Sequence, residues 1–263
     1  MKIDFAAQVD IGTKETNDDR VLIDGKVLKM NSCFGTCDVP ALAVVCDGCG
    51  GYSGGGVAAE TVLELLSLEK PKDLADTEYL AQVLDNCQQA VMGQQIETPQ
   101  FSKMCTTVAG CIFCDDSIVI FHSGDSRVYR YDRWGLARIT KDHSVIQELI
   151  DMGEITSEEA LKHPKRNVIT RCIGIEGLPP EIYVLHTPVN PGEKYLLCSD
   201  GLWESVSKSD IKKLLDSGLP LQEVVDKLVH NALLNGSDDN ISVCICGSQT
   251  APIVQENKPF ILD

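Results

Sequence analysis

The sequence has no long hydrophobic run. Its longest unbroken apolar stretch, Ala41–Cys46, is far shorter than the roughly 18 residues that cross a bilayer. The first ten residues contain an acid, Asp4, and no apolar core of the kind found in secretory signals. From these absences we expect a soluble cytoplasmic protein with no membrane partner.

Positive charge is scarce. The chain carries 23 Lys and Arg against 39 Asp and Glu, a formal net charge of −16. Such a charge repels nucleic acid phosphates and anionic lipid headgroups over most of the surface. We therefore expect no nucleic acid partner.

The 263 residues are 43% hydrophobic and 24% charged, values typical of a chain that folds around one core. We expect one compact domain that acts as a monomer.

The chain also lacks a Cys-x₅-Arg phosphate loop, so its twelve cysteines are not candidates for a phosphocysteine nucleophile. Without a secretory signal, we expect them to be reduced thiols. The pairs Cys46/Cys49 and Cys111/Cys114 have the spacing of zinc ligands. However, residues three apart on a strand point to opposite faces, and Cys111 and Cys114 lie in a predicted strand. We favour small buried hydrophobic residues over structural zinc.

The predicted strands come in clusters separated by helical pairs, which favours an α+β fold with antiparallel sheets covered by helices. The apolar patterns predict strands at 3–11, 21–23, 41–45, 106–121, 127–131, 168–173, 183–187, 194–198 and 241–246. They predict helices at 57–68, 77–92, 143–152, 157–161, 209–215 and 221–235.

Acidic residues stand at the ends of several predicted strands. Two such strands end in the pairs Asp47-Gly48 and Asp200-Gly201; Asp18-Asp19 and Asp239 directly precede two others. If these ends meet at one edge, the carboxylates repel one another unless cations neutralise them. A ligand set made only of oxygen selects Mg²⁺ or Mn²⁺. Taken singly, each acid is equally compatible with a solvated turn, because Asp-Gly is a common turn dipeptide.

The ordered set of motifs resembles the metal-dependent phosphatases of the protein phosphatase 2C family, in particular the short bacterial Ser/Thr type. The matching segments, in family order, are KETNDDR, VVCDGCGGYSGG, TTVAG, HSGDSRVYRY, ITKDHS, HPKRNVITRCIG, LLCSDGLWE and GSDDNISV. The resemblance implies a central β-sandwich of two mainly antiparallel sheets flanked by helix pairs, in αββα order. A phosphatase domain would then occupy residues 1–247, with a flap at about 145–167 and a C-terminal tail at 248–263.

The same resemblance implies a binuclear Mn²⁺ or Mg²⁺ centre at one end of the sandwich. Asp47 would bridge both ions and the Gly48 carbonyl would bind one of them. Asp200 and Asp239 would complete the first metal site.

Three further positions follow from the resemblance. Asp18 stands at the first acidic position of its motif as a ligand, and Asp19 would hold a water on a metal. Asp125 matches an acid that helps to hold a weaker third ion, although an ordinary corner-turn acid fits this position equally well. The implied reaction is hydrolysis of phosphoserine and phosphothreonine by a metal-activated water. The substrate would be a phosphorylated protein, either a target of a Ser/Thr kinase or a partner-switch regulator.

The sequence departs from the family pattern at two places. Lys14 stands where the family has an arginine that grips the substrate phosphate, and the segment 12–18 is one residue short. We expect Lys14 to contribute to catalysis with weaker phosphate binding, because an ammonium cannot form a bidentate fork. Cys49 stands where animal enzymes have a histidine proposed as general acid. His163, in the flap, is an alternative proton donor or simply a structural histidine.

Parts of the sequence are compatible with two other functions. The residues from Gly54 to Ala59 satisfy the spacing GxGxxA of dinucleotide-binding loops. They follow their strand too late for that fingerprint, so we do not favour it. The second alternative is a catalytically weak or inactive signalling domain with the same fold, for which the replacement at Lys14 leaves room.

Overall fold

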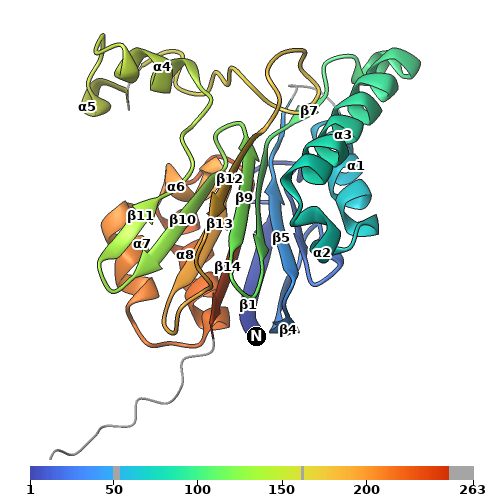
Figure 1. The fold of residues 1–263 in the computed structure, drawn as a ribbon. Helices are drawn as coiled ribbons and strands as arrows, with labels where there is room; N and C mark the ends of the chain where they lie inside the picture. Colours follow the sequence, from blue (N-terminus) through green and yellow to red (C-terminus); the bar gives the residue numbers. More distant parts are fainter. Residues whose placement is uncertain (50–53, 161–162, 249–263) are drawn as a thin grey trace, which may run out of the picture.

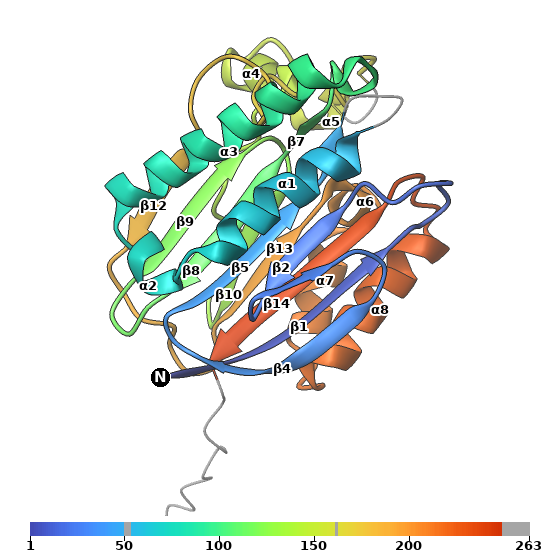
Figure 2. The same cartoon turned by 90° about the vertical axis from the view of Figure 1, so that its right-hand side faces the viewer.

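Two six-stranded sheets pack face to face in the computed structural model, which describes residues 1–49, 54–160 and 163–248. A layer of helices covers the outer face of each sheet (Figures 1 and 2). The α+β prediction and the αββα order of layers are therefore confirmed. Among the described residues, no helix combines the length and apolar composition that a bilayer crossing requires.

The first sheet contains both the first and the last strand of the described chain. β1 and β14 pair antiparallel over their full length, with Ile3 opposite Ser248 and Asp10 opposite Ile241. The neighbouring strands of this sheet are, in order, β11 (Gly135–Arg138), β10 (Arg127–Asp132), β13 (Lys194–Cys198), β14 (Ile241–Ser248), β1 (Lys2–Asp10) and β4 (Ser32–Asp38).

The second sheet carries the most continuously buried strands. Its order is β12 (Glu181–Leu185), β9 (Ile118–Ser123), β8 (Val108–Phe113), β5 (Ala41–Cys46), β2 (Arg20–Ile23) and β3 (Lys26–Leu28). All six residues of β5 are buried. Leu42 and Val44 face the helices, while Ala43 and Val45 face the first sheet. A strand covered on both faces explains the unbroken apolar run.

Helices close the two outer faces of the sandwich. In Figures 1 and 2, α1 and α3 cover the second sheet, and α6, α7 and α8 cover the first. The helices are α1 (Gly55–Leu68), α2 (Pro71–Leu74), α3 (Thr77–Glu97), α4 (Val145–Asp151), α5 (Ser157–Ala160), α6 (Asp200–Trp203), α7 (Lys208–Leu215), α8 (Leu221–Leu234) and a short 3₁₀ turn, η1 (Pro99–Phe101). Three apolar clusters fill the spaces between these four layers.

The cysteines mostly serve as small apolar residues in these clusters. Cys111 lies between the two sheets, whereas Cys114 packs in the layer between the second sheet and its helices. The prediction that this pair faces in opposite directions is confirmed, because the two thiols point into different layers. Cys46 is likewise buried in the core under α1.

The strand predicted at 168–173 was wrong. This segment makes only isolated bridges, between Ile169 and Ser144 and between Ile173 and Thr106. Ser144 directly precedes α4 and Thr106 ends the two-residue strand β7 (Cys105–Thr106), so each partner offers a single bridge and no continuous ladder forms. In contrast, the prediction missed β4, in which half-buried and exposed residues alternate. The segment SCFGTCD is built mainly from small and polar residues, so its apolar signal is weak.

The flap predicted at about 145–167 contains α4 and α5, which Figure 1 shows standing apart from the sandwich. Its base is an antiparallel pair: the Val145 amide donates to the Val168 carbonyl (2.9 Å), and the Thr170 amide donates to the His143 carbonyl (2.8 Å). The tail predicted at 248–263 lies outside the described residues except for Ser248, which ends β14.

Candidate metal centre and active site

Five aspartates from both sheets gather at one end of the sandwich, and we refer to them as the acid cluster. Each stands at the end of a strand. They are Asp19 before β2, Asp47 after β5, Asp125 between β9 and β10, Asp200 after β13 and Asp239 before β14. Burial raises the pKa of Asp47, and the charges of Asp19, Asp200, Asp125 and Asp239 raise it further, so these four acids lie near enough to act on it. The strand ends thus bring these acids into one region.

Burial and mutual repulsion act together on these carboxyl groups. Burial, followed by the charges of neighbouring acids, raises the pKa values of Asp47 and Asp200 far above the ordinary range. Burial raises the pKa of Asp19 to about 7 and that of Asp125 to about 6. Without a cation, the folded chain favours the neutral form of these acids.

The protein supplies few partners for this negative charge. Asp19 accepts a hydrogen bond from the Ser199 hydroxyl (2.7 Å). Asp200 Oδ1 is buried and accepts no hydrogen bond within the part of the chain that is described. A buried, unpartnered carboxylate oxygen is costly unless a cation binds it. The donor set is all oxygen, so these residues fit small hard dications such as Mn²⁺ and Mg²⁺.

Asp47 is held through its backbone. Its amide donates to the Thr107 hydroxyl (3.0 Å), and its carbonyl accepts from the Thr107 amide (2.8 Å) and the Thr106 hydroxyl (3.0 Å). These bonds fix the chain where β5 ends and leave the carboxylate free to face the other acids. Thr107 was missed as a positioning residue in the sequence, where it looks like an ordinary strand residue.

Asp18 lies beside the acid cluster, at the N-terminus of α1. Its Oδ1 accepts a hydrogen bond from the Gly56 amide (2.9 Å), and its charge raises the pKa of Asp19. A negative group is well placed at a helix N-terminus. Since Asp18 already occupies the position that a dinucleotide phosphate would take, the structure supports the rejection of that function for the glycine-rich segment.

The glycines of the two Asp-Gly pairs are required by close backbone contacts. A Cβ atom on Gly48 would lie 2.2 Å from the carbonyl carbon of Gly55 at the start of α1. A Cβ atom on Gly201 would lie 2.0 Å from the carbonyl oxygen of Asn240. Both pairs therefore lie in packed junctions, unlike solvated turns.

Asn240 joins the segments that carry the acids. Its Oδ1 accepts from the Asp18 amide (2.8 Å), and its Nδ2 donates to the carbonyls of Ile11 (2.8 Å) and Thr16 (3.0 Å). The sequence showed the pair Asp239-Asn240 but not these partners, which lie more than 200 residues away. Asn240 fixes the loop before β2 against the start of β14.

Lys14 and His163, the residues considered for phosphate binding and for proton donation, lie in different places. Lys14 Nζ forms an ion pair with Asp239 Oδ1 (3.1 Å), and both side chains are about half exposed. Burial opposes its charge, but the hydrogen bond and charge of Asp239 raise the pKa of Lys14. The Nδ1 of His163 instead accepts from the Lys165 amide within the flap (3.2 Å). The structure thus places Lys14 at the acid cluster, whereas His163 forms its hydrogen bonds within the flap.

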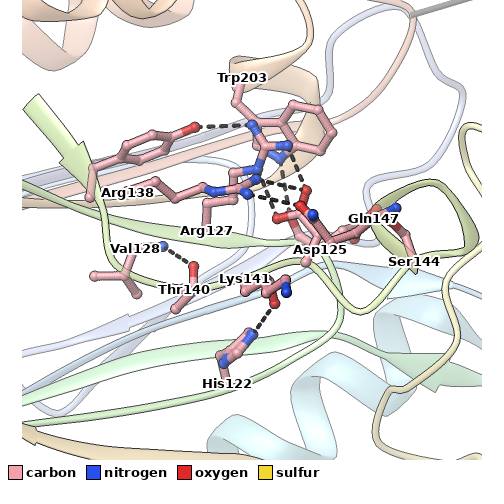
Figure 3. A network of polar contacts seen from close by, with 12 residues as sticks. His122, Asp125, Arg127, Val128, Arg138, Thr140, Lys141, Ser144, Gln147 and Trp203 are labelled. Atoms are coloured by element: carbon pink, nitrogen blue, oxygen red, sulfur yellow. Dashed lines mark hydrogen bonds and ion pairs between the residues drawn. The ribbon is translucent and has the colours of Figure 1, made fainter. Parts of the chain in front are cut away.

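A second buried charge network lies next to Asp125 (Figure 3). Asp142 pairs with Arg127 (2.6 Å) and with Arg138 (3.0 Å). The Arg127 guanidinium stacks over the Trp203 ring, 3.4 Å from its centroid, and Trp203 Nε1 donates to the Asp125 carbonyl (3.1 Å). This network holds the turn that presents Asp125.

The family model for protein phosphatase 2C matches residues 31–235. The chain belongs to the protein phosphatase 2C family. It is 31% identical over 218 residues to the serine/threonine phosphatase Stp of Listeria monocytogenes, which covers 81% of this chain and 86% of Stp.

Solved protein phosphatase 2C structures share the fold. The Mycobacterium tuberculosis serine/threonine phosphatase PstP superposes with a TM-score of 0.80 at 30% identity, covering 95% of this chain and 100% of the solved one. A second PstP structure is the catalytic domain in complex with two manganese ions. It has a TM-score of 0.78 and 29% identity, with 94% and 99% of the two chains covered.

Proposed function

We propose that this chain is a metal-dependent phosphatase that hydrolyses phosphoserine and phosphothreonine in proteins. The observation that carries the proposal is the acid cluster, in which buried and partly exposed carboxylates from both sheets lie close together with few protein partners. Relatives named serine/threonine phosphatases and the manganese complex of PstP support it.

The residues that would hold the metals are those that the family resemblance assigns. Asp47 and the Gly48 carbonyl are placed together at the end of β5, with Asp200 and Asp239 beside them. Asp18, Asp19 and Asp125 would complete the ligand shell and its waters. When bound, two such ions acidify a water and neutralise phosphoryl oxygens during in-line displacement.

The protein's own groups position the substrate and the acids. The Lys14 ammonium lies at the exposed edge of the cluster, where it can attract a phosphate. In the absence of substrate it pairs with Asp239, so phosphate and Asp239 compete for the same cation. Ser199 and Asn240 hold Asp19 and Asp18 through hydrogen bonds, which fixes the acids before substrate arrives.

We propose that the flap at 145–167 selects among phosphoproteins, within a phosphatase domain of residues 1–247. The flap projects beyond the sandwich and is anchored at its base, so it can contact residues that flank a phosphorylated side chain. Targets of a Ser/Thr kinase and partner-switch regulators are the two substrate classes. Comparison of phosphoproteomes with and without the protein would identify the class.

Hydrolysis of p-nitrophenyl phosphate and of a phosphothreonine peptide tests the reaction. We expect turnover with Mn²⁺ or Mg²⁺, none with a chelator, and none in Asp47→Asn or Asp239→Asn. The matched control is Asp85→Asn, an exposed acid on α3, which should keep full activity. A wild-type chain that is inert with both metals would instead support the non-catalytic signalling domain.

A further inference from the structure

Three cysteines from distant parts of the chain meet beside the acid cluster, and we call them the thiol cluster. Cys49 lies in β6 (Gly48–Cys49) and is the antiparallel partner of Cys105 in β7 (Cys105–Thr106). Thr106 in turn bridges to Ile173, which brings the neighbouring Cys172 to the same place. The three Sγ atoms all lie within 4.8 Å of one another.

The thiol cluster differs from the other cysteines of the protein. Cys105 and Cys172 are only 6% and 4% exposed, and Cys49 is half-buried. Cys49 Sγ lies 2.7 Å from Cys105 Sγ. Elsewhere in the described chain, Cys244 and Cys246 form a pair of thiols with their Sγ atoms 4.0 Å apart, and the other cysteines pack mainly among apolar side chains.

Three convergent thiolates prefer a particular class of metal ion. Thiolate sulfur is soft and selects ions such as Zn²⁺ and Cu⁺ over Mg²⁺ or Mn²⁺. With a Zn–S distance of about 2.3 Å, tetrahedral geometry separates two sulfur ligands by about 3.8 Å. The distances between the Sγ atoms of the thiol cluster are close to this value. The Sγ atoms of Cys49 and Cys105 need to move apart by only about 1 Å to reach it.

A second group of potential ligands, His122, His143 and Glu181, does not carry the same argument. The two imidazole rings are stacked, with centroids 4.4 Å apart and planes 17° from parallel. Nitrogen lone pairs lie in the ring plane, so stacked rings do not converge on one ion. The backbone bonds one nitrogen of each ring: His122 Nε2 bonds the Lys141 carbonyl (2.8 Å), and His143 Nδ1 accepts from the Gly124 amide (3.1 Å). The other nitrogen of His143, Nε2, lies 3.2 Å from a carboxylate oxygen of Glu181.

We propose that Cys49, Cys105 and Cys172 bind one thiophilic cation of the Zn²⁺ class, at a site separate from the acid cluster. Three protein ligands leave the fourth position of such an ion open to water or a small thiol. The ion would join β6, β7 and the segment at 172 into one unit. Because Cys49 follows Gly48 directly, this unit borders the loop that carries Asp47.

Titration of the fully reduced chain with Co²⁺ or Cd²⁺ tests this site without any activity assay. Thiolate ligation produces a ligand-to-metal charge-transfer absorption that carboxylate ligation does not. We expect the band to saturate at one ion per chain. It should persist with excess Mg²⁺ and in Asp239→Asn, because neither removes a thiol. A wild-type chain without the band would overturn the site.

Single cysteine variants locate the bound ion. Cys105→Ala and Cys172→Ala should each lose the band or weaken Cd²⁺ binding by more than about tenfold. Cys244→Ala, which removes a buried thiol from the other sulfur pair, should leave it unchanged. Circular dichroism checks the fold of each variant, and Cys49→Ala replaces any variant that does not fold. A band that survives in all folded cluster variants, or that disappears in Cys244→Ala, would refute the proposal.

Discussion

Two groups of charges meet at Asp125 and are built in opposite ways. In the network of Figure 3, the Asp142 carboxylate is 8% exposed and pairs with two arginines. In the acid cluster, Asp47 faces four other carboxylates. A buried charge with partners holds a turn in place. A buried charge without partners destabilises the metal-free fold. Such a charge is retained because a bound ion or substrate supplies the missing partner.

The largest expected difference is in the response to losing one carboxylate of the acid cluster. Asp47→Asn should abolish Mn²⁺-dependent hydrolysis down to the background rate, because the proposed bridging ligand is lost. The same change should raise the melting temperature of the metal-free chain, because it removes buried like-charge repulsion. Calorimetry with a chelator measures the second effect. A lower melting temperature would mean that the cluster is stabilised by partners.

Removal of Asp142 should have the opposite effect on stability. Asp142→Ala leaves Arg127 buried without its partner, which typically costs about 3–5 kcal/mol. Urea unfolding of the metal-free chain measures this loss. Arg138→Ala is the matched control, because Arg127 still neutralises Asp142 in that variant, and its loss should be smaller. Equal losses in the two variants would contradict the central role of the Arg127 pair.

The pH dependence of stability distinguishes the two groups again. The pKa of Asp19 is raised from 3.8 to about 7, and that of Asp125 from 3.8 to about 6. In this pH interval the folded chain holds protons that the unfolded chain has released, so raising the pH favours unfolding. The free energy of unfolding of the metal-free chain should therefore fall as pH rises from about 4 to about 7. Each pKa unit corresponds to about 1.4 kcal/mol.

Mn²⁺ should restore this stability near pH 8, because it binds the folded acids in their charged form. Thermal melts with and without Mn²⁺ across this range provide the measurement. Asp19→Asn should flatten the metal-free profile. A profile that stays steep in this variant would assign the titration to other groups.

The smallest predicted effect concerns Lys14. Lys14→Arg should lower KM for a small phosphoester a few-fold, because a guanidinium can bind phosphate with two hydrogen bonds. The ion pair with Asp239 can be kept by either residue. Steady-state kinetics at saturating Mn²⁺ provides the test, and kcat should change less than KM. An unchanged or higher KM would remove Lys14 from phosphate binding.

The sequence predicted the features that depend on local pattern. The buried run before Asp47 and the similar strand before Asp200 were both recognised from apolar residues followed by Asp-Gly. Such strands need only neighbours in the chain, and both lie where the sequence placed them. The flap and Lys14 came instead from the resemblance to the family.

Other features depend on contacts that no local pattern contains. Asn240 reaches Ile11 and Thr16 from the other end of the chain. Cys172 meets Cys49 through the bridge from Ile173 to β7 and the pairing of β7 with β6. The CxxC spacing drew attention to Cys46 and Cys111, which are both core residues. The segment 168–173 resembled a strand in composition, but it makes only isolated bridges, to Ser144 and Thr106.

The place of β14 in the first sheet also affects how the chain can be made. β14 lies between β1 and β13 and is their hydrogen-bonding partner. During synthesis, β1 therefore cannot complete its pairing with β14 until residue 248 has left the ribosome. Sheets that depend on such distant pairing form late and expose apolar edges meanwhile. We expect nascent chains stopped before residue 241 to be sensitive to protease and to bind chaperones.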